Sequence, residues 1–138
     1  MMDQDELRKR TKQFALRIIK LAEALPNTIT GKIIKNQLIR CGTSVGANYR
    51  AVCRGRSRAD FISKLGIVLE ESDESAFWLE LIIDGNLLKR KLVEPLLTEA
   101  NELTAIFSAT IISSKKKTWD AGCKMFLTFE IANLTSEI

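Results

Sequence analysis

The hydrophobic pattern of the chain predicts four amphipathic helices joined by short polar connections. In the first helix, about Asp3 to Leu25, apolar residues recur at helical spacing on one face: Leu7, Phe14, Ile18, Leu21 and Leu25. Pro26 and Asn27 end this helix, and Thr28 or Thr30 can cap the next.

The second helix, about Thr30 to Arg54, has the most regular pattern. Spacings of four and three alternate along a heptad seam formed by Ile34, Leu38, Cys41, Val45, Asn48 and Val52. Asn48 is the polar exception, and a buried amide of this kind fixes helix register when its hydrogen bonds are satisfied. Ser44, Ser72 and Ser75 are its expected partners, so Asn48 is interpreted as structural rather than ligand-binding.

Two further helices follow Gly55, which ends the second. Ser57 to Asp60 reads as a capping box for a third helix, about Arg58 to Leu88, with an expected core face of Phe61, Leu65, Val68, Ser72, Ala76, Leu79 and Ile83. The small Ser72 and Ala76 allow a neighbouring helix to approach closely. The fourth helix, about Leu92 to Ile112, carries Leu92, Leu96, Ala100, Leu103 and Phe107 on one stripe.

Four long helices with short connections predict an all-α, antiparallel up-down-up-down four-helix bundle over residues 1–114. One core is expected to contain Leu38, Val45, Phe61, Leu65, Leu79, Leu103 and Phe107. Residues 115–138 form a C-terminal extension that begins with Lys115, Lys116 and Lys117 but is apolar from Trp119 onward. Its pattern leaves open whether it docks on the bundle or is poorly ordered.

The composition of the chain excludes several classes of functional site. The chain has 138 residues, enough for one domain, and no histidine, which excludes histidine-dependent nucleophiles and histidine-ligated metals. No apolar run of about 18 residues occurs, so no membrane partner is expected. No cofactor or metal is expected either. The charged N-terminus argues against a signal peptide. Three cysteines, Cys41, Cys53 and Cys123, lack metal-type spacing and favour a reducing cytoplasm.

Charge changes sign sharply along the chain. Between Thr30 and Lys64 there are eight Lys or Arg and one acid, whereas between Glu70 and Asp84 there are six acids and no base. The basic residues fall mainly on the side of the second helix opposite its seam and in the following turn. They are the candidate nucleic-acid-binding residues: Lys32, Arg40, Arg50, Arg54, Arg56 and Arg58. The alternative is a solvated helix face, or salt-bridge partners for acids elsewhere in the chain.

The acidic segment permits an enzyme hypothesis, which the sequence disfavours. Glu70, Glu71 and Glu74 have the spacing with which helical nucleotide pyrophosphohydrolases hold Mg²⁺. Such a site needs a second carboxylate pair on another helix, but Glu80 and Asp84 lie on the same helix. We therefore regard catalysis as the remote alternative.

A protein contact is the better interpretation of the same helix. Phe77 and Leu81 point away from its core face and lie among acids that include Glu70 and Glu74. Large apolar side chains in an acidic surround are typical of an interface, here with a neighbouring subunit that would supply the basic face of the second helix.

The segment from Arg40 to Leu81 resembles the 23S ribosomal RNA intervening-sequence proteins, whose relatives include accessory proteins of diversity-generating retroelements. The matching elements are Thr43–Arg50, Asp60–Leu65, Glu71–Ser75 and Trp78–Leu81, within a resemblance that spans about Phe14 to Ser114. One departure is that the acid usual after the Asn-Tyr-Arg element is replaced here by Ala51, Val52 and Cys53.

The resemblance implies an antiparallel bundle that assembles into a ring-shaped pentamer, has a basic surface associated with RNA or DNA, and has no established catalytic activity. Together with the charge pattern, it leads to the expectation of a non-enzymatic oligomer that binds RNA or DNA through a basic helix face. The alternative is a structural adaptor whose charged faces serve self-assembly and a protein partner.

Overall fold

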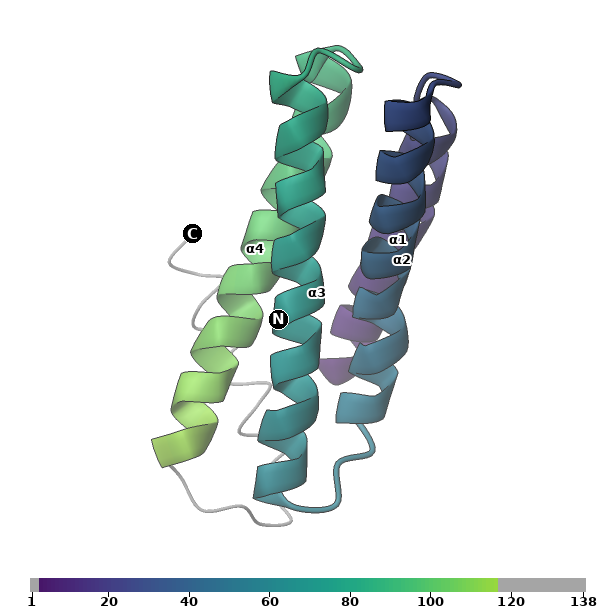
Figure 1. Ribbon diagram of the computed structural model, residues 1–138. Coiled ribbons are helices and arrows are strands. Elements are labelled where there is room, and N and C mark those ends of the chain that lie inside the picture. Colours follow the sequence, from purple (N-terminus) through teal and green to yellow (C-terminus); the bar gives the residue numbers. More distant parts are fainter. Residues whose placement is uncertain (1–2, 117–138) are drawn as a thin grey trace.

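The computed structural model describes residues 3–116, and they form four helices (Figure 1). The helices are α1 (Gln4–Glu23), α2 (Ile29–Val52), α3 (Arg58–Asp84) and α4 (Arg90–Lys116). The α1–α2 and α3–α4 connections lie together at the top of Figure 1, and we call this the two-loop end. The α2–α3 connection lies at the opposite, one-loop end, with the start of α1 and the end of α4. The predicted antiparallel four-helix bundle is confirmed.

Three helices begin at a polar side chain that caps the helix N-terminus. The side chains of Asp3, Thr28 and Ser57 accept hydrogen bonds from backbone N–H groups three residues ahead, at 2.8, 3.0 and 3.1 Å. The carboxylate of Asp60 accepts a bond from the N–H of Arg56 at 3.1 Å, which completes a variant of the expected capping box. The hydrogen bond from the ammonium of Lys64, followed by this bond from Arg56, lowers the pKa of Asp60.

The third helix ends four residues earlier than expected, because the turn after it has a strong stop signal. Asn86 adopts the left-handed conformation, with φ of 55°. The N–H of Asn86 bonds the carbonyl of Ile83, and the N–H of Leu87 bonds the carbonyl of Ile82, each at 3.0 Å. This is a Schellman motif, in which Asn occupies the position most often taken by glycine. The prediction that α3 extends to Leu88 is therefore wrong.

The core lies along the bundle axis and contains all seven of the residues expected in it. Within residues 3–116 each helix packs against its two neighbours, and the diagonal pairs do not approach each other. Two glycines bring α1 and α2 close. A Cβ on Gly42 would lie 2.7 Å from the side chain of Ile18, and one on Gly46 would lie 3.3 Å from the carbonyl oxygen of Thr11.

Two seam positions differ from the prediction. Asn48 is only half-buried and donates a hydrogen bond to the backbone carbonyl of Ser44 at 2.9 Å, whereas Tyr49 is fully buried and packs on Phe107. An α-helix repeats every 3.6 residues rather than 3.5, so the buried face after Val45 reaches Tyr49. The register role proposed for a buried Asn48 is therefore wrong.

In the fourth helix, too, the predicted buried face is displaced by one residue. Leu92 was expected in the core but is 55% exposed, and Val93 is buried in its place. The helix also begins two residues earlier than expected, at Arg90, and Pro95 lies inside it, beyond the first turn. Ser72 is buried as predicted, and Thr104 of α4 approaches it with 2.9 Å between the two hydroxyl oxygens.

The α1–α4 side is the least tightly packed side of the bundle. A cluster of charged groups bridges it at mid-height: the guanidinium of Arg10 bonds the carboxylate of Glu99 through Nε at 2.8 Å and that of Glu102 through Nη2 at 2.6 Å. Among the described helices, none is sufficiently long and apolar to cross a membrane. Residues 115–116 of the expected C-terminal extension continue α4, and the prediction for the rest lies outside the described residues.

Candidate nucleic-acid interface

Four of the six predicted nucleic-acid-binding residues gather at the one-loop end of the bundle. Arg50 lies in the last turn of α2, Arg54 and Arg56 are exposed in the α2–α3 connection, and Arg58 is the first residue of α3. Lys32 lies 18 residues before Arg50 on the same helix, about 27 Å away at 1.5 Å per residue. The six residues therefore do not form one continuous surface.

A basic groove runs between α1 and α2 near the one-loop end. It has a volume of about 500 Å³ and is lined by Arg8, Lys9, Lys12, Ala15, Thr43, Gly46, Ala47 and Arg50. Four of these eight side chains are cationic and none is acidic. Arg50 is thus the predicted residue that the fold combines with further cations, and we call this site the α1–α2 groove.

The shape of the groove follows from the small residues on its floor. Gly46 and Ala47 have little or no side chain, and the close approach of Gly46 to the Thr11 backbone brings the two helices together beneath the cations. The basic side chains therefore stand along the two edges of a shallow channel. A phosphate in such a channel can receive charge-assisted hydrogen bonds from both edges.

One cation on the α1 side of the groove already has an acidic partner on the same helix. Arg8 forms an ion pair with Asp5 one turn earlier, and both side chains are largely exposed. An exposed pair of this kind contributes little free energy, so a phosphate can replace Asp5 at small cost.

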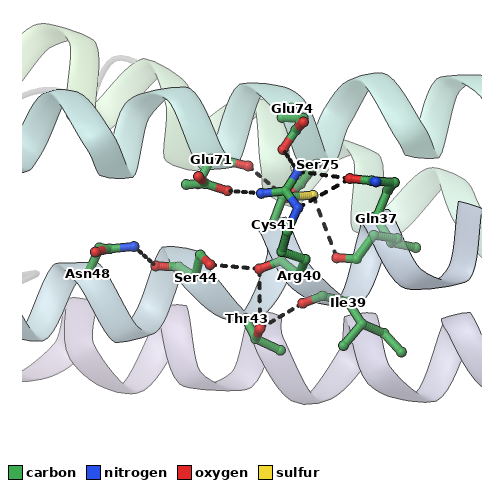
Figure 2. A network of polar contacts seen from close by, with 11 residues as sticks. Gln37, Ile39, Arg40, Cys41, Thr43, Ser44, Asn48, Glu71, Glu74 and Ser75 are labelled. Carbon is green, nitrogen blue, oxygen red and sulfur yellow. Dashed lines mark hydrogen bonds and ion pairs between the residues drawn. The ribbon is translucent and has the colours of Figure 1, made fainter.

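Arg40 has a different role from the one predicted (Figure 2). Its guanidinium spans from α2 to α3, where it pairs with Glu74 and, at 3.4 Å, with Glu71. It also bonds the side-chain oxygen of Gln37 through Nε at 3.2 Å. The hydrogen bond to Glu74 is the main cause of the raised pKa of Arg40. Because two carboxylates of the same chain already neutralise it, Arg40 is a weak candidate for phosphate binding.

Arg58 also has an intramolecular partner. Its guanidinium donates a hydrogen bond to the backbone carbonyl of Lys115 in the last turn of α4. A cation at the C-terminus of a helix stabilises the partial negative charge there. Arg58 therefore joins α3 to α4 at the one-loop end, and the more accessible cations of this end are Arg54 and Arg56.

Two of the three glutamates in the pyrophosphohydrolase hypothesis pair with a cation of the same chain. Glu71 and Glu74 face Arg40, while Glu99 and Glu102 of α4 face Arg10. Within residues 3–116 no three His, Cys, Asp or Glu side chains are arranged to hold a metal ion. Glu71 and Glu74 of the acidic segment therefore serve in cross-helix ion pairs.

Cys41, the most buried cysteine in the described part of the chain, is not a nucleophile at neutral pH. Its side chain is inaccessible and lies 3.3 Å from the hydroxyl of Ser75, and burial raises the pKa of the thiol to about 11. Only the thiolate reacts with alkylating agents. We expect Cys41 to resist iodoacetamide at pH 7 in the folded protein and to react after denaturation, as read by mass spectrometry of its peptide. Rapid alkylation of Cys41 in the native state would contradict this.

The predicted interface residues are exposed as expected, with one complication. Phe77 and Leu81 are 51% and 37% exposed, and the ring of Phe77 packs edge-on against Trp78 at 5.2 Å. Glu70 is exposed, whereas Glu74 is engaged with Arg40. Their part in a subunit contact stays a prediction.

The nucleic-acid-binding residues predicted from the sequence do not include Arg8, Lys9 and Lys12, which line the groove. The signal was present as the run Leu7-Arg8-Lys9-Arg10-Thr11-Lys12 in the first helix. Only the antiparallel register of α1 and α2 places this run against Arg50. A charge count confined to the second helix could not show that the groove is shared.

Comparison with known proteins places these features in a family. The family model described as "23S rRNA-intervening sequence protein" matches residues 4–109. The chain belongs to the 23S rRNA-intervening sequence protein family. The match covers most of α1 through α4 and includes every residue that lines the α1–α2 groove.

A solved structure supports both the family and the fold. The chain is 36% identical to a protein of unknown function of the S23 ribosomal protein family from Bacteroides thetaiotaomicron VPI-5482, with a TM-score of 0.70. The alignment covers 75% of this chain and 96% of that one. A search of curated proteins found no match.

Proposed function

We propose that this family member is a non-enzymatic cytoplasmic protein that binds RNA or DNA by its phosphate backbone in the α1–α2 groove. The observation that carries the proposal is the convergence of Arg8, Lys9 and Lys12 with Arg50 around one channel without an acidic lining residue. Arg54 and Arg56, exposed at the same end, extend the positive surface beyond the groove.

The lining of the groove also indicates what is recognised. Proteins that bind single strands stack bases on aromatic side chains, and none of the eight lining residues is aromatic. Contacts from Lys and Arg to phosphates position a nucleic acid without reading its sequence. We therefore expect binding that depends strongly on salt and weakly on base sequence. The family description fits an RNA partner, and sequence-independent contacts extend to DNA.

The groove can be tested with a variant that removes three of its cations. Lys9→Gln, Lys12→Gln and Arg50→Gln together should weaken binding to a duplex of arbitrary sequence, and to a similar degree for unrelated sequences. Each lost phosphate contact should reduce the slope of log K against log salt by about 0.9, so the slope should fall by about 3 in total. Fluorescence anisotropy over a salt series measures both quantities.

A matched control separates local contacts from net charge. Lys89→Gln, Arg90→Gln and Lys91→Gln remove the same charge from exposed positions at the two-loop end. We expect this control to retain nearly the wild-type slope. Equal losses in the two variants would show non-local attraction and reject the groove. Absence of wild-type binding at low salt would reject nucleic-acid binding and leave the adaptor function as the explanation of the charged faces.

A further inference from the structure

A second set of cations lies across the one-loop end of the bundle. Arg54 and Arg56 are exposed in the α2–α3 connection, and Lys115 and Lys116 are exposed in the last turn of α4. Arg58 brings the two pairs together, because its guanidinium at the start of α3 donates a hydrogen bond to the backbone carbonyl of Lys115. We call Arg54, Arg56, Lys115 and Lys116 the end track.

The charges of the end track are available to an anion from outside the chain. Within residues 3–116, none of its four side chains forms an ion pair with a carboxylate. The acid nearest to it in α3, Asp60, is paired with the ammonium of Lys64 at 3.0 Å and accepts the backbone N–H of Arg56 at 3.1 Å. The charge of Asp60 is therefore largely offset within its own helix turn.

The end track continues the positive charge of the α1–α2 groove. Arg50, which lines the groove, lies four residues, or about one helical turn, before Arg54. From Ala47 to Arg58 the sequence contains four arginines and no acid. A polyanion that leaves the groove at Arg50 therefore meets the end track next.

The two surfaces run in different directions. The groove is lined by positions from Arg8 to Ala15 on α1 and from Thr43 to Arg50 on α2, so it follows the helix axes for about 10 Å. The end track instead passes from α2 to the start of α3 and on to the end of α4, across the lower end of the bundle in Figure 1. A ligand that contacts both surfaces must turn sharply at the end of α2.

A continuous duplex resists such a turn. Duplex DNA keeps its direction over about 50 nm. The longest helices of the bundle have 27 residues, about 40 Å at 1.5 Å per residue, so the turn would have to occur within a small fraction of that length. A single strand is flexible, and its phosphates can follow a path of Lys and Arg side chains. The end track has no aromatic residue on which unpaired bases could stack, so a single strand alone would be held by its phosphates only.

We propose that the preferred ligand is a junction between a duplex and a single strand. The backbone of the duplex lies in the α1–α2 groove, and the unpaired strand turns at Arg50 and lies on the end track. This inference rests on the proposed function and narrows its ligand to nucleic acid that is partly paired, such as a duplex with an overhang or a stem beside an unpaired segment. The junction is recognised by shape and charge, because phosphate contacts carry no sequence information.

Three probes that share one duplex sequence test the proposal. They are a short blunt duplex, the same duplex with a single-stranded extension, and a fully paired duplex as long as the extended probe. The extension is placed on each strand in turn, and the tighter of these two probes is used. We expect the extended probe to bind most tightly. Each added contact to a single strand should raise the slope of log K against log salt by about 0.7, or by about 2.8 for all four cations. Fluorescence anisotropy over a salt series measures both quantities.

Arg54→Gln with Arg56→Gln separates the end track from the groove. For the extended probe this variant should lose about 1.4 of the slope, whereas its binding to the short blunt duplex should stay close to that of the wild type. Lys89→Gln with Lys91→Gln is the matched control, because it removes the same charge from exposed positions at the two-loop end. The control should retain the full advantage of the extended probe. Circular dichroism checks that both variants fold.

Three results would overturn the junction and leave the proposed function intact. In the first, the wild type binds the extended probe no more tightly than the short blunt duplex. In the second, the long paired duplex binds as tightly as the extended probe and loses the same slope in the Arg54 and Arg56 variant, which would show that a bent duplex follows the end track. In the third, the control variant loses as much as the end-track variant.

Failure of the proposed function has a different signature. The wild type would then bind none of the three probes, or the groove variant with Lys9, Lys12 and Arg50 replaced would bind the short blunt duplex as well as the wild type does. Either outcome removes the duplex from the α1–α2 groove and overturns the junction with it.

Discussion

Val45→Asp should reduce the free energy of unfolding by about 3–5 kcal/mol, enough to leave the bundle marginally stable or unfolded. Val45 is fully buried in the core, one turn from Tyr49, which packs on Phe107 of α4 at 5.9 Å between ring centroids. A carboxylate at this position would lose its hydration and gain no cation. The helix could not turn it toward solvent without exposing Leu38 and Tyr49.

Urea unfolding followed by far-ultraviolet circular dichroism measures this loss. Asn36→Asp is a suitable control because it introduces the same side chain on the same helix at an exposed position. We expect its unfolding midpoint to remain close to that of the wild type. A Val45→Asp midpoint within error of the control would show that the α2 seam does not face a closed core.

The fold was predictable from the sequence because its strongest signals are local. The capping residues Asp3, Thr28 and Ser57 and the spacing of the apolar residues fix where helices start and which face is buried. The errors arose where the phase of a helix decides between two adjacent candidates. The residues of each pair, Asn48 and Tyr49 or Leu92 and Val93, differ by 100° of rotation, and a heptad template drifts by about 20° per heptad, or about 40° over the two heptads from Ile34 to Asn48.

The candidate site was only half predictable, for a different reason. Arg50 was identified from the charge pattern of one helix, but the groove needs the α1 cations that the antiparallel register places beside it. Conversely, the charge pattern of the second helix indicated that Arg40 is free to bind phosphate. In the folded chain Glu71 and Glu74 lie opposite it on α3 and pair with it. Side chains that meet across helices are separated by tens of residues in the sequence. A charge count along the chain cannot tell a free cation from a paired one.

Arg10→Met should destabilise the bundle by about 2–3 kcal/mol, because it leaves two carboxylates without their shared cation on the loosely packed α1–α4 side. The side chain of Arg10 is 21% exposed and that of Glu99 is 15% exposed, so water replaces the lost bonds poorly. Glu102 is 38% exposed, which keeps the loss below that of a fully buried triad. The hydrogen bond to Glu99 is the largest cause of the raised pKa of Arg10.

Arg40→Met provides the matched comparison, because Arg40 also joins two carboxylates across two helices. Its side chain is 48% exposed, so solvent and salt screen its ion pairs, and we expect a clearly smaller loss than for Arg10. Urea midpoints of both variants, measured at low and high salt, test the difference. The Arg10 loss should persist in high salt and the Arg40 loss should shrink. If the two variants lose equal stability, the Arg10 cluster does not hold α1 against α4, and the apolar core alone closes that side of the bundle.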